Sequence, residues 1–185
     1  MAQPEIMLNE ADVGAVVDRL AAELSETYDD GVVMVAVLRG SVLFLADLVR
    51  AMTIRATVDF VSLSPYTPGT GRVRFVMDTS TNLEGRQVVI VEDIVDTGLT
   101  SAFLLGEFAR RAPESLALCT LIDRPARRVV PVAIGHTGLQ IEDRFVIGYG
   151  LDFEGRYRNV KCVASADLDV LSADPDAYVE ALYCA

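Results

Sequence analysis

The chain begins with an apolar pattern of helical period. After Asn9, valine, leucine and alanine recur every three or four residues as far as Leu24, and the run Asp-Asp-Gly at 29–31 ends the pattern. Apolar positions at this spacing form one face of an amphipathic helix, and Asn is a favoured N-cap residue. We therefore predict a helix that starts at Asn9 and packs one face on the body of the protein.

Further along the chain, continuous apolar runs alternate with helical patterns. Apolar runs of this length suit strands that are covered on both faces, and strands alternating with helices imply right-handed crossovers in a parallel sheet. The fold class is therefore α/β. The expected strands are Val32–Leu38, Thr57–Leu63, Val88–Val91 and Leu116–Ile122, and the expected helices are Val42–Met52, with Ser41 as its cap, and Ala102–Arg111.

Three segments break this alternation. Residues 64–72 contain two prolines and two glycines, which predicts a loop that is either a mobile lid or a long connection. From 129 to 163, short apolar stretches separated by Gly, Asp and Arg indicate a small hood, built together with the N-terminal segment, so that residues 1–185 form a single domain. The acidic tail is expected to contain a short helix that starts near Asp174 and Pro175.

Composition and charge narrow the range of ligands. The chain has 185 residues, 51% of them hydrophobic, and a formal net charge of −11. The charge is −7 over residues 1–30, −2 over 31–123, +3 over 124–161 and −5 over 162–185, and fifteen of the sixteen basic residues are arginine. An acidic chain disfavours nonspecific binding to nucleic acid, whereas guanidinium groups favour bidentate contacts with the phosphate of a small ligand.

Cysteine usage and hydropathy bear on location. Cys119, Cys162 and Cys184 are too few and too widely spaced for a disulfide framework or a CxxC metal site, which favours a reducing compartment. The N-terminus lacks a basic region followed by an apolar run, and no segment reaches about 18 uninterrupted apolar residues. We expect a cytoplasmic protein that contacts neither membrane nor nucleic acid.

Residues 88–100, VVIVEDIVDTGLT, carry the clearest chemical pattern. A buried strand delivers Glu92 and Asp93 to its carboxyl end, and a turn with Asp96 and Gly98 then enters a helix. Ligands of open α/β sheets bind at such strand ends. Backbone N–H groups at a helix start, together with threonine hydroxyls, hold phosphate, and glycine lets the chain approach it closely. The alternative is a solvated turn with an Asp cap.

The two adjacent carboxylates conflict with a phosphate site. Like charges about 4 Å apart repel by roughly 4 kcal/mol at an effective dielectric near 20. Sugar hydroxyls that donate to Glu92 and Asp93, or a Mg²⁺ ion that bridges carboxylate and phosphate oxygens, would remove this conflict. The pattern therefore favours a ligand with ribose hydroxyls, a divalent cation, or both.

Residues 88–100 resemble the binding motif for 5-phosphoribosyl diphosphate (PRPP) in type I phosphoribosyltransferases. The adjacent Glu and Asp are the form of this motif that is typical of the purine salvage members. Four further segments agree in order and spacing: LRGS at 38–41, SPY at 64–66, DRP at 123–125 and DRFVIGYGLDFEGRYRN at 143–159. The resemblance spans residues 32–163 and is to the hypoxanthine (hypoxanthine-guanine) phosphoribosyltransferase family.

The resemblance implies a parallel sheet of about five strands flanked by helices, with a small hood over its carboxyl edge. It also implies a reaction in which N9 of hypoxanthine or guanine displaces pyrophosphate from C1 of PRPP, with Mg²⁺ as cofactor, in a homodimer or homotetramer. By family position, the resemblance implies that Asp96 is the general base and that the 5′-phosphate is bound by Asp96, Thr97, Gly98, Leu99 and Thr100. It implies that Glu92 and Asp93 bind ribose, that pyrophosphate is bound by Arg39, Gly40 and Arg158, and that the purine is bound by Arg124, Phe145, Val146 and Asp152. It also implies that Ser64 and Tyr66 belong to the lid and that the metal lies at Asp152, Glu92 and Asp93.

The chain departs from the family pattern at two positions. Arg124 stands where members usually have Lys, and because a planar guanidinium is not interchangeable with an ammonium group, the choice among hypoxanthine, guanine and xanthine stays open. Pro65 replaces the usual small residue before Tyr66 and is expected to stiffen the lid. Two other functions also stay open: transfer to another base, such as xanthine or a pyrimidine, and a non-enzymatic nucleotide sensor that binds RNA.

Some charged and aromatic residues near these motifs are interpreted as structural. Arg127 and Arg128 are expected to be surface charges, and His136, the only histidine, is expected to lie on an exposed turn. Tyr149 and Phe153 are as compatible with the core as with the site.

Overall fold

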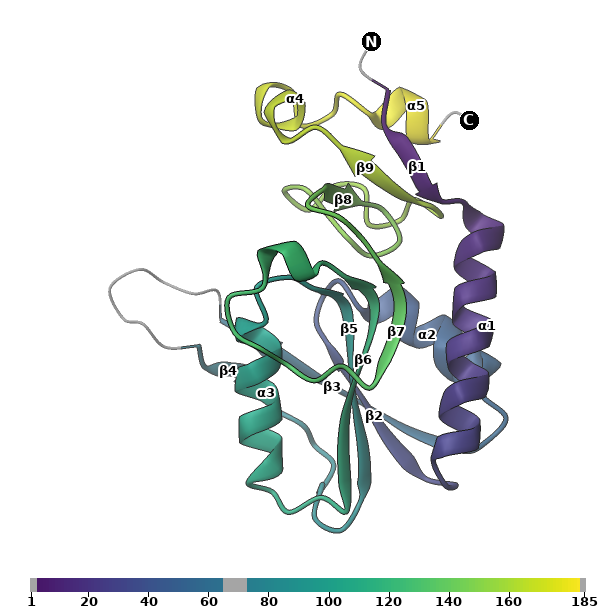
Figure 1. Cartoon of the computed structure of the whole chain (residues 1–185), viewed down its shortest axis with the longest axis vertical. Coiled ribbons are helices and arrows are strands. Elements are labelled where there is room, and N and C mark those ends of the chain that lie inside the picture. Colours follow the sequence, from purple (N-terminus) through teal and green to yellow (C-terminus); the bar gives the residue numbers. More distant parts are fainter. Residues whose placement is uncertain (1–2, 65–72, 184–185) are drawn as a thin grey trace.

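The computed structural model describes residues 3–64 and 73–183, which form a main sheet with helices on both faces and a hood above one end (Figure 1). The main sheet has the strand order β4-β3-β2-β5-β6-β7, and all neighbouring strands are parallel except the edge pair β4 and β3. The strands are β2 Val32–Val37, β3 Ala56–Leu63, β4 Phe75–Met77, β5 Gln87–Val95, β6 Ser115–Asp123 and β7 His136–Gln140. The predicted α/β class and the parallel sheet are confirmed.

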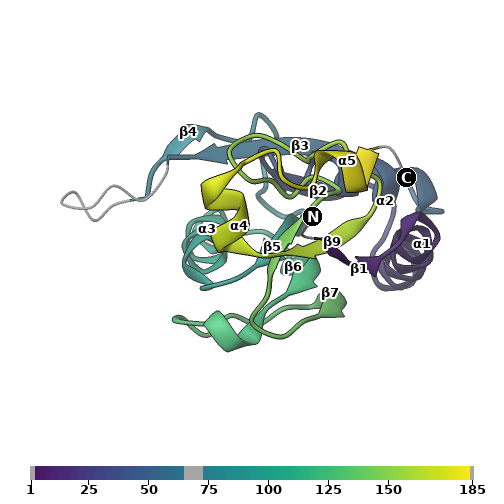
Figure 2. The same cartoon turned by 90° about the horizontal axis from the view of Figure 1, so that it is seen from above.

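The helices divide between the two faces of the main sheet, with α1 (Glu10–Thr27) and α2 (Val42–Ala51) on one and α3 (Leu99–Ala109) on the other (Figures 1 and 2). Alternate side chains of β2 enter the two cores that result. Val32, Met34 and Ala36 enter the core on the side of α1 and α2. Val33, Val35 and Val37 enter the core on the side of α3. Because all six residues are buried, β2 is the doubly covered strand that its apolar run predicts.

Helix α1 starts as predicted. Asn9 Oδ1 accepts hydrogen bonds from the N–H groups of Ala11 and Asp12, and the Asp12 carboxylate accepts one from the N–H of Asn9. This reciprocal capping box satisfies backbone donors that the helix leaves without partners. The buried side of α1 packs against α2 and β7, so the cap fixes the junction between the body and the preceding strand, β1 (Glu5–Leu8).

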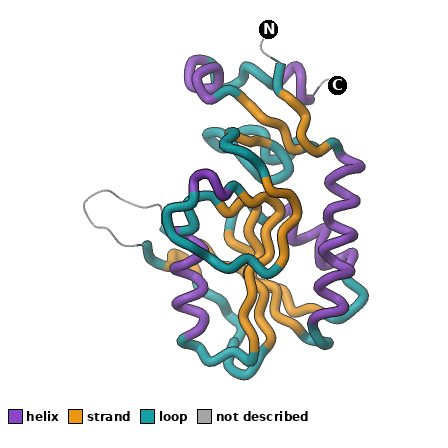
Figure 3. The backbone as a smooth tube through the Cα atoms, viewed as in Figure 1, coloured by secondary structure: helices purple, strands orange, loops and turns teal. Residues whose placement is uncertain are grey.

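The hood is a three-stranded antiparallel sheet in the order β1-β9-β8, with β9 at Val163–Ala166 and β8 at Phe145–Ile147. Two short helices, α4 (Leu168–Ala173) and α5 (Val179–Tyr183), complete it. The strands of the main sheet lie between the longer helices, and the hood lies at one end of this body (Figure 3). Among the described residues, no helix is long and apolar enough to cross a membrane.

Three predictions about the C-terminal half are wrong. Strand β7 lies in the region assigned to the hood, but it pairs in parallel with β6 and belongs to the main sheet. His136 is therefore the first residue of a strand, packed beside Tyr28, rather than part of an exposed turn. The predicted helix start at Asp174 and Pro175 falls between α4 and α5, because the N–H groups of Ala177 and Val179 bond to carbonyls three residues back, as in turns.

Three local boundaries near the site also differ from the predictions. Strand β5 continues to Val95 because β6 pairs with it along its whole length. Helix α3 starts at Leu99 rather than Ala102. The Ser41 hydroxyl, predicted to cap α2, instead donates to the Val37 carbonyl at 2.6 Å.

Replacement of Asn9 by alanine should lower the free energy of unfolding by about 1 kcal/mol, since the N–H groups of Ala11 and Asp12 lose their side-chain acceptor, whereas the backbone N–H of residue 9 can still donate to Asp12. Gly14 offers a matched change of opposite sign in the same helix. A methyl group there meets no atom within 4 Å, so Gly14→Ala should stabilise the protein by roughly 0.5–1 kcal/mol. Urea denaturation measures both effects, and equal stability of Asn9→Ala and the wild type would show that the cap contributes nothing.

Candidate functional site

A cleft of about 560 Å³ opens at the carboxyl ends of β2 and β5 and is called the main cleft below. These strands are neighbours in the main sheet, and ligands of open α/β sheets bind at this edge. The lining residues are Val37, Leu38, Gly40, Leu63, Ser64, Val73, Glu92, Asp93, Thr97, Leu99, Thr100, Asp152 and Arg158. Nine of the predicted site residues therefore meet in one cavity, although they come from both the main sheet and the hood.

Glu92 and Asp93 are adjacent in β5, so their side chains point to opposite faces of the main sheet. Glu92 is 5% exposed, and the Ser101 hydroxyl of α3 donates to it at 3.3 Å. Burial, followed by the charge of Asp93, raises the pKa of Glu92 to about 8. Burial also raises the pKa of Asp93 to about 6, although hydrogen bonds from the backbone oppose this shift. The proton that Glu92 keeps near neutral pH therefore relieves the repulsion between the two carboxylates.

Gly40 lies directly on Asp93. A Cβ atom at position 40 would overlap the Asp93 carboxylate, so only glycine fits there. Gly40 lies in the turn of residues 38–41 that follows β2, called the Gly40 turn below, and the peptide bond between Leu38 and Arg39 in this turn is cis. Leu38 and Gly40 line the main cleft, whereas Arg39, predicted to bind pyrophosphate, is exposed and does not line it. The turn therefore presents residue 40, not the Arg39 side chain, to the cleft.

Residues 96–100 form the turn that enters α3. Gly98 is the N-cap with a φ of 81°, and a Cβ atom there would overlap the Val130 carbonyl oxygen. Gly98 brings no capping side chain, and the Leu99 N–H donates to Thr97 Oγ1 at 3.4 Å. The next N–H groups in the first turn of α3 are therefore the ones available to an anion. Three residues of this turn line the main cleft: Thr97, Leu99 and Thr100. This geometry supports the predicted phosphate site.

The Asp96 carboxylate is held by a buried arginine. Arg124 is 5% exposed and donates from Nε to Oδ1 at 3.1 Å and from Nη2 to Oδ2 at 2.7 Å. Its Nη1 donates to the Arg144 carbonyl. A bidentate pair of this kind fixes both the position and the plane of a carboxylate. Asp96 therefore keeps one orientation at the end of β5, outside the lining of the main cleft.

A smaller pocket of about 170 Å³ lies beside the main cleft and shares Asp93 and Asp152 with it. All four residues predicted to bind the purine line this smaller pocket, and its full lining is Asp93, Ile94, Arg124, Phe145, Val146, Leu151 and Asp152. Phe145 begins β8, and its ring meets that of Phe153 edge-on at a centroid distance of 6.0 Å. The apolar walls suit a flat ring, and Arg124 adds hydrogen-bond donors.

Arg158 and Asp152, both from the segment between β8 and β9, form an ion pair at the main cleft. Arg158 Nη2 lies 2.6 Å from Asp152 Oδ1, and Arg158 Nη1 donates to the Gly150 carbonyl at 2.6 Å. Asp152 Oδ2 also accepts a hydrogen bond from the Gly155 N–H at 2.7 Å. An anion in the main cleft would compete with Asp152 for the Arg158 guanidinium, so this ion pair can exchange partners when a ligand binds.

Arg128 is a structural residue whose role the sequence did not reveal. It donates from Nε to the Asp96 carbonyl at 2.9 Å and from Nη2 to the Val95 carbonyl at 3.2 Å, and it pairs with the Asp123 carboxylate. The prediction of a surface charge is therefore wrong, because this guanidinium supports the backbone at the end of β5. The neighbouring Arg127 is half exposed, and no local pattern distinguishes the two arginines.

Several predicted residues lie at the edge of the two cavities or away from them. Ser64 lines the main cleft, and its backbone and hydroxyl group pair with the backbone of Arg74. Tyr66, with Pro65, lies outside the described residues. Tyr149 is buried beside α2.

Within residues 3–64 and 73–183, no group of three or more His, Cys, Asp or Glu side chains is close enough to hold a metal by itself.

Known proteins resemble this chain in both sequence and fold. A family model described as phosphoribosyl transferase domain matches residues 6–154. A hypoxanthine phosphoribosyltransferase from Salmonella typhimurium is 39% identical over 170 residues, covering 89% of this chain and 96% of the relative. A hypoxanthine-guanine-xanthine phosphoribosyltransferase from Tritrichomonas foetus is 40% identical over 162 residues, covering 85% and 88%. A crystal structure of a hypoxanthine-guanine phosphoribosyltransferase from Bacillus anthracis is 37% identical, with a TM-score of 0.85 and coverage of 90% and 100%.

The raised pKa of Glu92 predicts that the stability of the protein falls as pH rises. The unfolded chain loses this proton near pH 4.5, whereas the folded protein holds it up to about pH 8. The stabilisation is therefore complete below the unfolded pKa and is lost as pH rises through the folded one. Within this window, the contribution of Glu92 should fall by roughly 1.4 kcal/mol per pH unit.

Glu92→Gln should remove this slope, because the amide is neutral at every pH and has nearly the same shape. The free energy of unfolding, measured in urea with a chelator present between about pH 5 and 8, should favour the variant increasingly as pH rises. Parallel slopes for the variant and the wild type would contradict a protonated, buried Glu92.

Proposed function

The chain belongs to the phosphoribosyltransferase family, and from this membership we propose that it is a purine salvage enzyme that transfers the 5-phosphoribosyl group of PRPP to N9 of hypoxanthine and of guanine. The products are IMP or GMP and pyrophosphate. The names of relatives that cover most of this chain support the substrate class.

The observation that carries the proposal is the pair of neighbouring cavities. The main cleft offers carboxylates that accept from sugar hydroxyls and a helix N-terminus that binds phosphate. The smaller pocket offers apolar walls and one guanidinium, which suit a 6-oxopurine. Asp93 and Asp152 line both cavities, so the sugar and the base would meet beside these two residues.

In the main cleft, residues 96–100 bind the 5′-phosphate through the N–H groups of α3 and the threonine hydroxyls. Glu92 and Asp93 accept hydrogen bonds from the ribose hydroxyls. Gly40 and Arg158, which also line the cleft, bind pyrophosphate. Arg39 joins them only if its exposed side chain turns toward the cleft on binding.

In the smaller pocket, Phe145 stacks on the purine and Val146 contacts its edge through backbone groups. Arg124 donates to the purine O6. A guanidinium has five N–H donors, and Asp96 and the Arg144 carbonyl occupy three of those of Arg124. Two N–H groups are therefore left for a base.

Asp96 is the general base that exchanges the proton at purine N7. As the bond between C1 and pyrophosphate breaks, the sugar gains positive charge and the leaving group gains negative charge. Arg158 and the Gly40 turn stabilise the leaving group, while the bidentate contact with Arg124 keeps the Asp96 carboxylate oriented for proton transfer.

The carboxylates of Asp152 and Asp93 fit Mg²⁺, and so does Glu92 once it gives up its proton to the solvent. This ion usually binds through one or two carboxylates and completes its coordination with waters and substrate oxygens. Since no described cluster could hold a metal alone, the three residues would bind the ion jointly with PRPP. When bound, the ion neutralises charge that collects on pyrophosphate.

The remaining assignments concern the surroundings of the site. Ser64, which lines the cleft, and Tyr66 belong to a lid that closes over the substrates. The protein works in the cytoplasm as a homodimer or homotetramer, without nucleic-acid or membrane partners. Xanthine is the alternative base, because the name of the Tritrichomonas foetus relative includes it.

Parallel assays with PRPP, Mg²⁺ and hypoxanthine, guanine or xanthine test the proposed function. We expect IMP and GMP, resolved by chromatography, with one pyrophosphate released per nucleotide. Reactions without Mg²⁺ serve as the control. Formation of the xanthine nucleotide alone would favour the alternative base, and the absence of product with every base would overturn the proposal.

Asp96→Asn should lower kcat by about 100-fold or more and change the Kd for PRPP by less than about 3-fold, because the amide keeps the shape of the carboxylate but cannot take the proton. Glu92→Gln should do the reverse, weakening PRPP binding with a smaller loss of kcat, because a ribose acceptor changes. Single-turnover kinetics and PRPP titration separate the two effects. Unchanged turnover in Asp96→Asn would exclude it as the base.

A further inference from the structure

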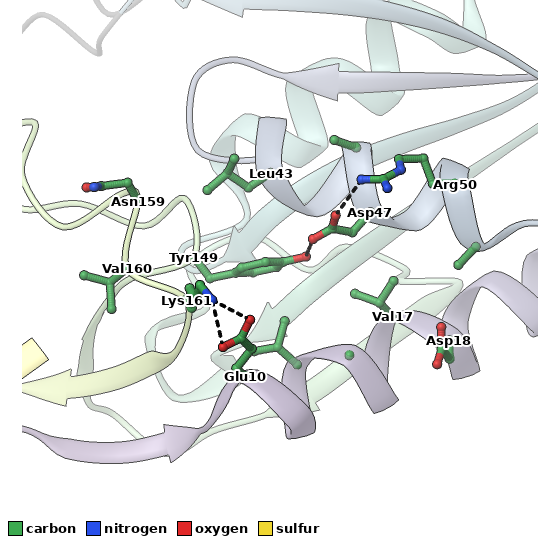
Figure 4. A pocket seen from close by; sticks show the side chains of 14 residues that line it. Glu10, Val17, Asp18, Leu43, Asp47, Arg50, Tyr149, Asn159, Val160 and Lys161 are labelled. Carbon is green, nitrogen blue, oxygen red and sulfur yellow. Dashed lines mark hydrogen bonds and ion pairs between the residues drawn. The ribbon is translucent and has the colours of Figure 1, made fainter. Parts of the chain in front are cut away.

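A hydrogen bond between two side chains joins the hood to α2 away from the substrate cavities. The Tyr149 hydroxyl donates to Asp47 Oδ2 at 2.6 Å, at the wall of a separate pocket of about 680 Å³ (Figure 4). The tyrosine is 6% exposed, whereas the Asp47 side chain is 47% exposed and lies 3.8 Å from Arg50. Burial and the adjacent carboxylate raise the pKa of Tyr149, so its hydroxyl stays a donor at neutral pH.

The turn that carries Tyr149, residues 148–150, is called the hood turn below and has an unusual backbone. Tyr149 has a φ of 49°, and its neighbours Gly148 and Gly150 have φ values of 96° and 98°. A non-glycine residue in this left-handed region persists only where surrounding contacts hold it. The hydroxyl bond to Asp47 and the hydrogen bond from the Tyr149 N–H to the Val160 carbonyl at 2.8 Å are such contacts.

This turn rests directly on the part of the cleft assigned to pyrophosphate. A Cβ atom at Gly150 would overlap the Gly40 carbonyl oxygen, and one at Gly40 would overlap the Asp93 carboxylate. Gly150, Gly40 and Asp93 therefore form a stack with no side chain at either glycine to absorb a displacement. A shift of the hood turn must move Gly40 or be blocked by it.

The same turn also holds Arg158. The Gly150 carbonyl accepts from Arg158 Nη1 at 2.6 Å, and the Gly150 N–H donates to the Arg158 carbonyl at 2.8 Å. Both groups assigned to pyrophosphate, the Gly40 turn and the Arg158 guanidinium, thus contact the residue next to Tyr149. Asp47 lies on α2, the helix that follows the Gly40 turn, so the Tyr149–Asp47 bond ties the two sides of this contact together.

We propose that Tyr149 and Asp47 are a positioning pair that sets the distance between the hood turn and the Gly40 turn, and thereby aligns the pyrophosphate half of the site. Neither side chain lines the main cleft or the smaller pocket. The pair acts through Gly150, Gly40 and Arg158. This role rests on the proposed function, which supplies pyrophosphate as the group to be aligned.

Tyr149→Phe tests the pair because it removes one hydroxyl and leaves the buried ring. We expect the KM for PRPP, and the KM for pyrophosphate in the reverse reaction, to rise about 5-fold or more, with the KM for hypoxanthine changed less than about 2-fold. Asp47→Ala removes the acceptor at a half-exposed position and should reproduce this pattern. Asp47→Asn keeps an acceptor oxygen and should restore values close to the wild type.

Two matched controls separate positioning from stability. Tyr178→Phe removes another buried hydroxyl of the hood, one that accepts from the Asp167 N–H, and should leave both KM values unchanged. Arg50→Ala removes the exposed ion pair to Asp47 and should do the same. In a double-mutant cycle, Tyr149→Phe with Asp47→Ala should lose no more than either single change.

Unchanged KM values for PRPP and pyrophosphate in Tyr149→Phe, an equal rise in the KM for hypoxanthine, or additive losses in the double variant would each overturn the positioning role. Wild-type protein without turnover on any base would instead refute the proposed function. In that case, calorimetric titration with magnesium pyrophosphate tests the positioning role of Tyr149 and Asp47, because it measures binding and does not depend on turnover. Equal Kd values in the wild type and Tyr149→Phe, or no binding to either, would overturn the positioning role, whereas weaker binding to the variant would support it.

Discussion

Two glycines bring three layers of the protein into contact: Gly150 of the hood lies on the Gly40 carbonyl, and Gly40 lies on the Asp93 carboxylate of β5. Close packing of this kind leaves no slack, because a single added methyl group must displace backbone or a buried carboxylate. The hood, the turn after β2 and the centre of the main sheet are thus held at one spacing. Both cavities share the carboxylate at the bottom of this stack, so their relative position depends on it.

Electrostatics in the site follow from this packing. Glu92 and Asp93 are buried at the end of the sheet with raised pKa values, and the arginines nearby are already paired. Arg124 holds Asp96, Arg128 holds Asp123, and Arg158 holds Asp152. The positive window at 124–161 is therefore not a free basic surface. In the proposed function, an anionic ligand would replace an internal carboxylate partner of one of these arginines, so that its binding would be an exchange of ion pairs.

Much of this arrangement could be predicted from the sequence because it depends on short-range rules. The helix after Asn9, the covered strand β2 and the turn at 96–100 each follow from local patterning. The opposite directions of Glu92 and Asp93 also follow from the two-residue period of a strand, but only if β5 is known to reach Val95. The stack of Gly150 on Gly40, and the support that Arg128 gives to β5, join residues far apart in the chain, and no local pattern encodes them.

The hood sheet has a consequence for the order in which the protein forms. Strand β1 pairs with β9, so that Glu5 lies opposite Ser165, whereas β2 to β7 lie between them in the chain. During synthesis every strand of the main sheet is made before β9, and β1 must wait for β9 before it can pair. Closing such a long loop is slow relative to local pairing. A nascent or truncated chain can therefore have a folded main sheet and still lack the hood, which supplies part of the proposed site.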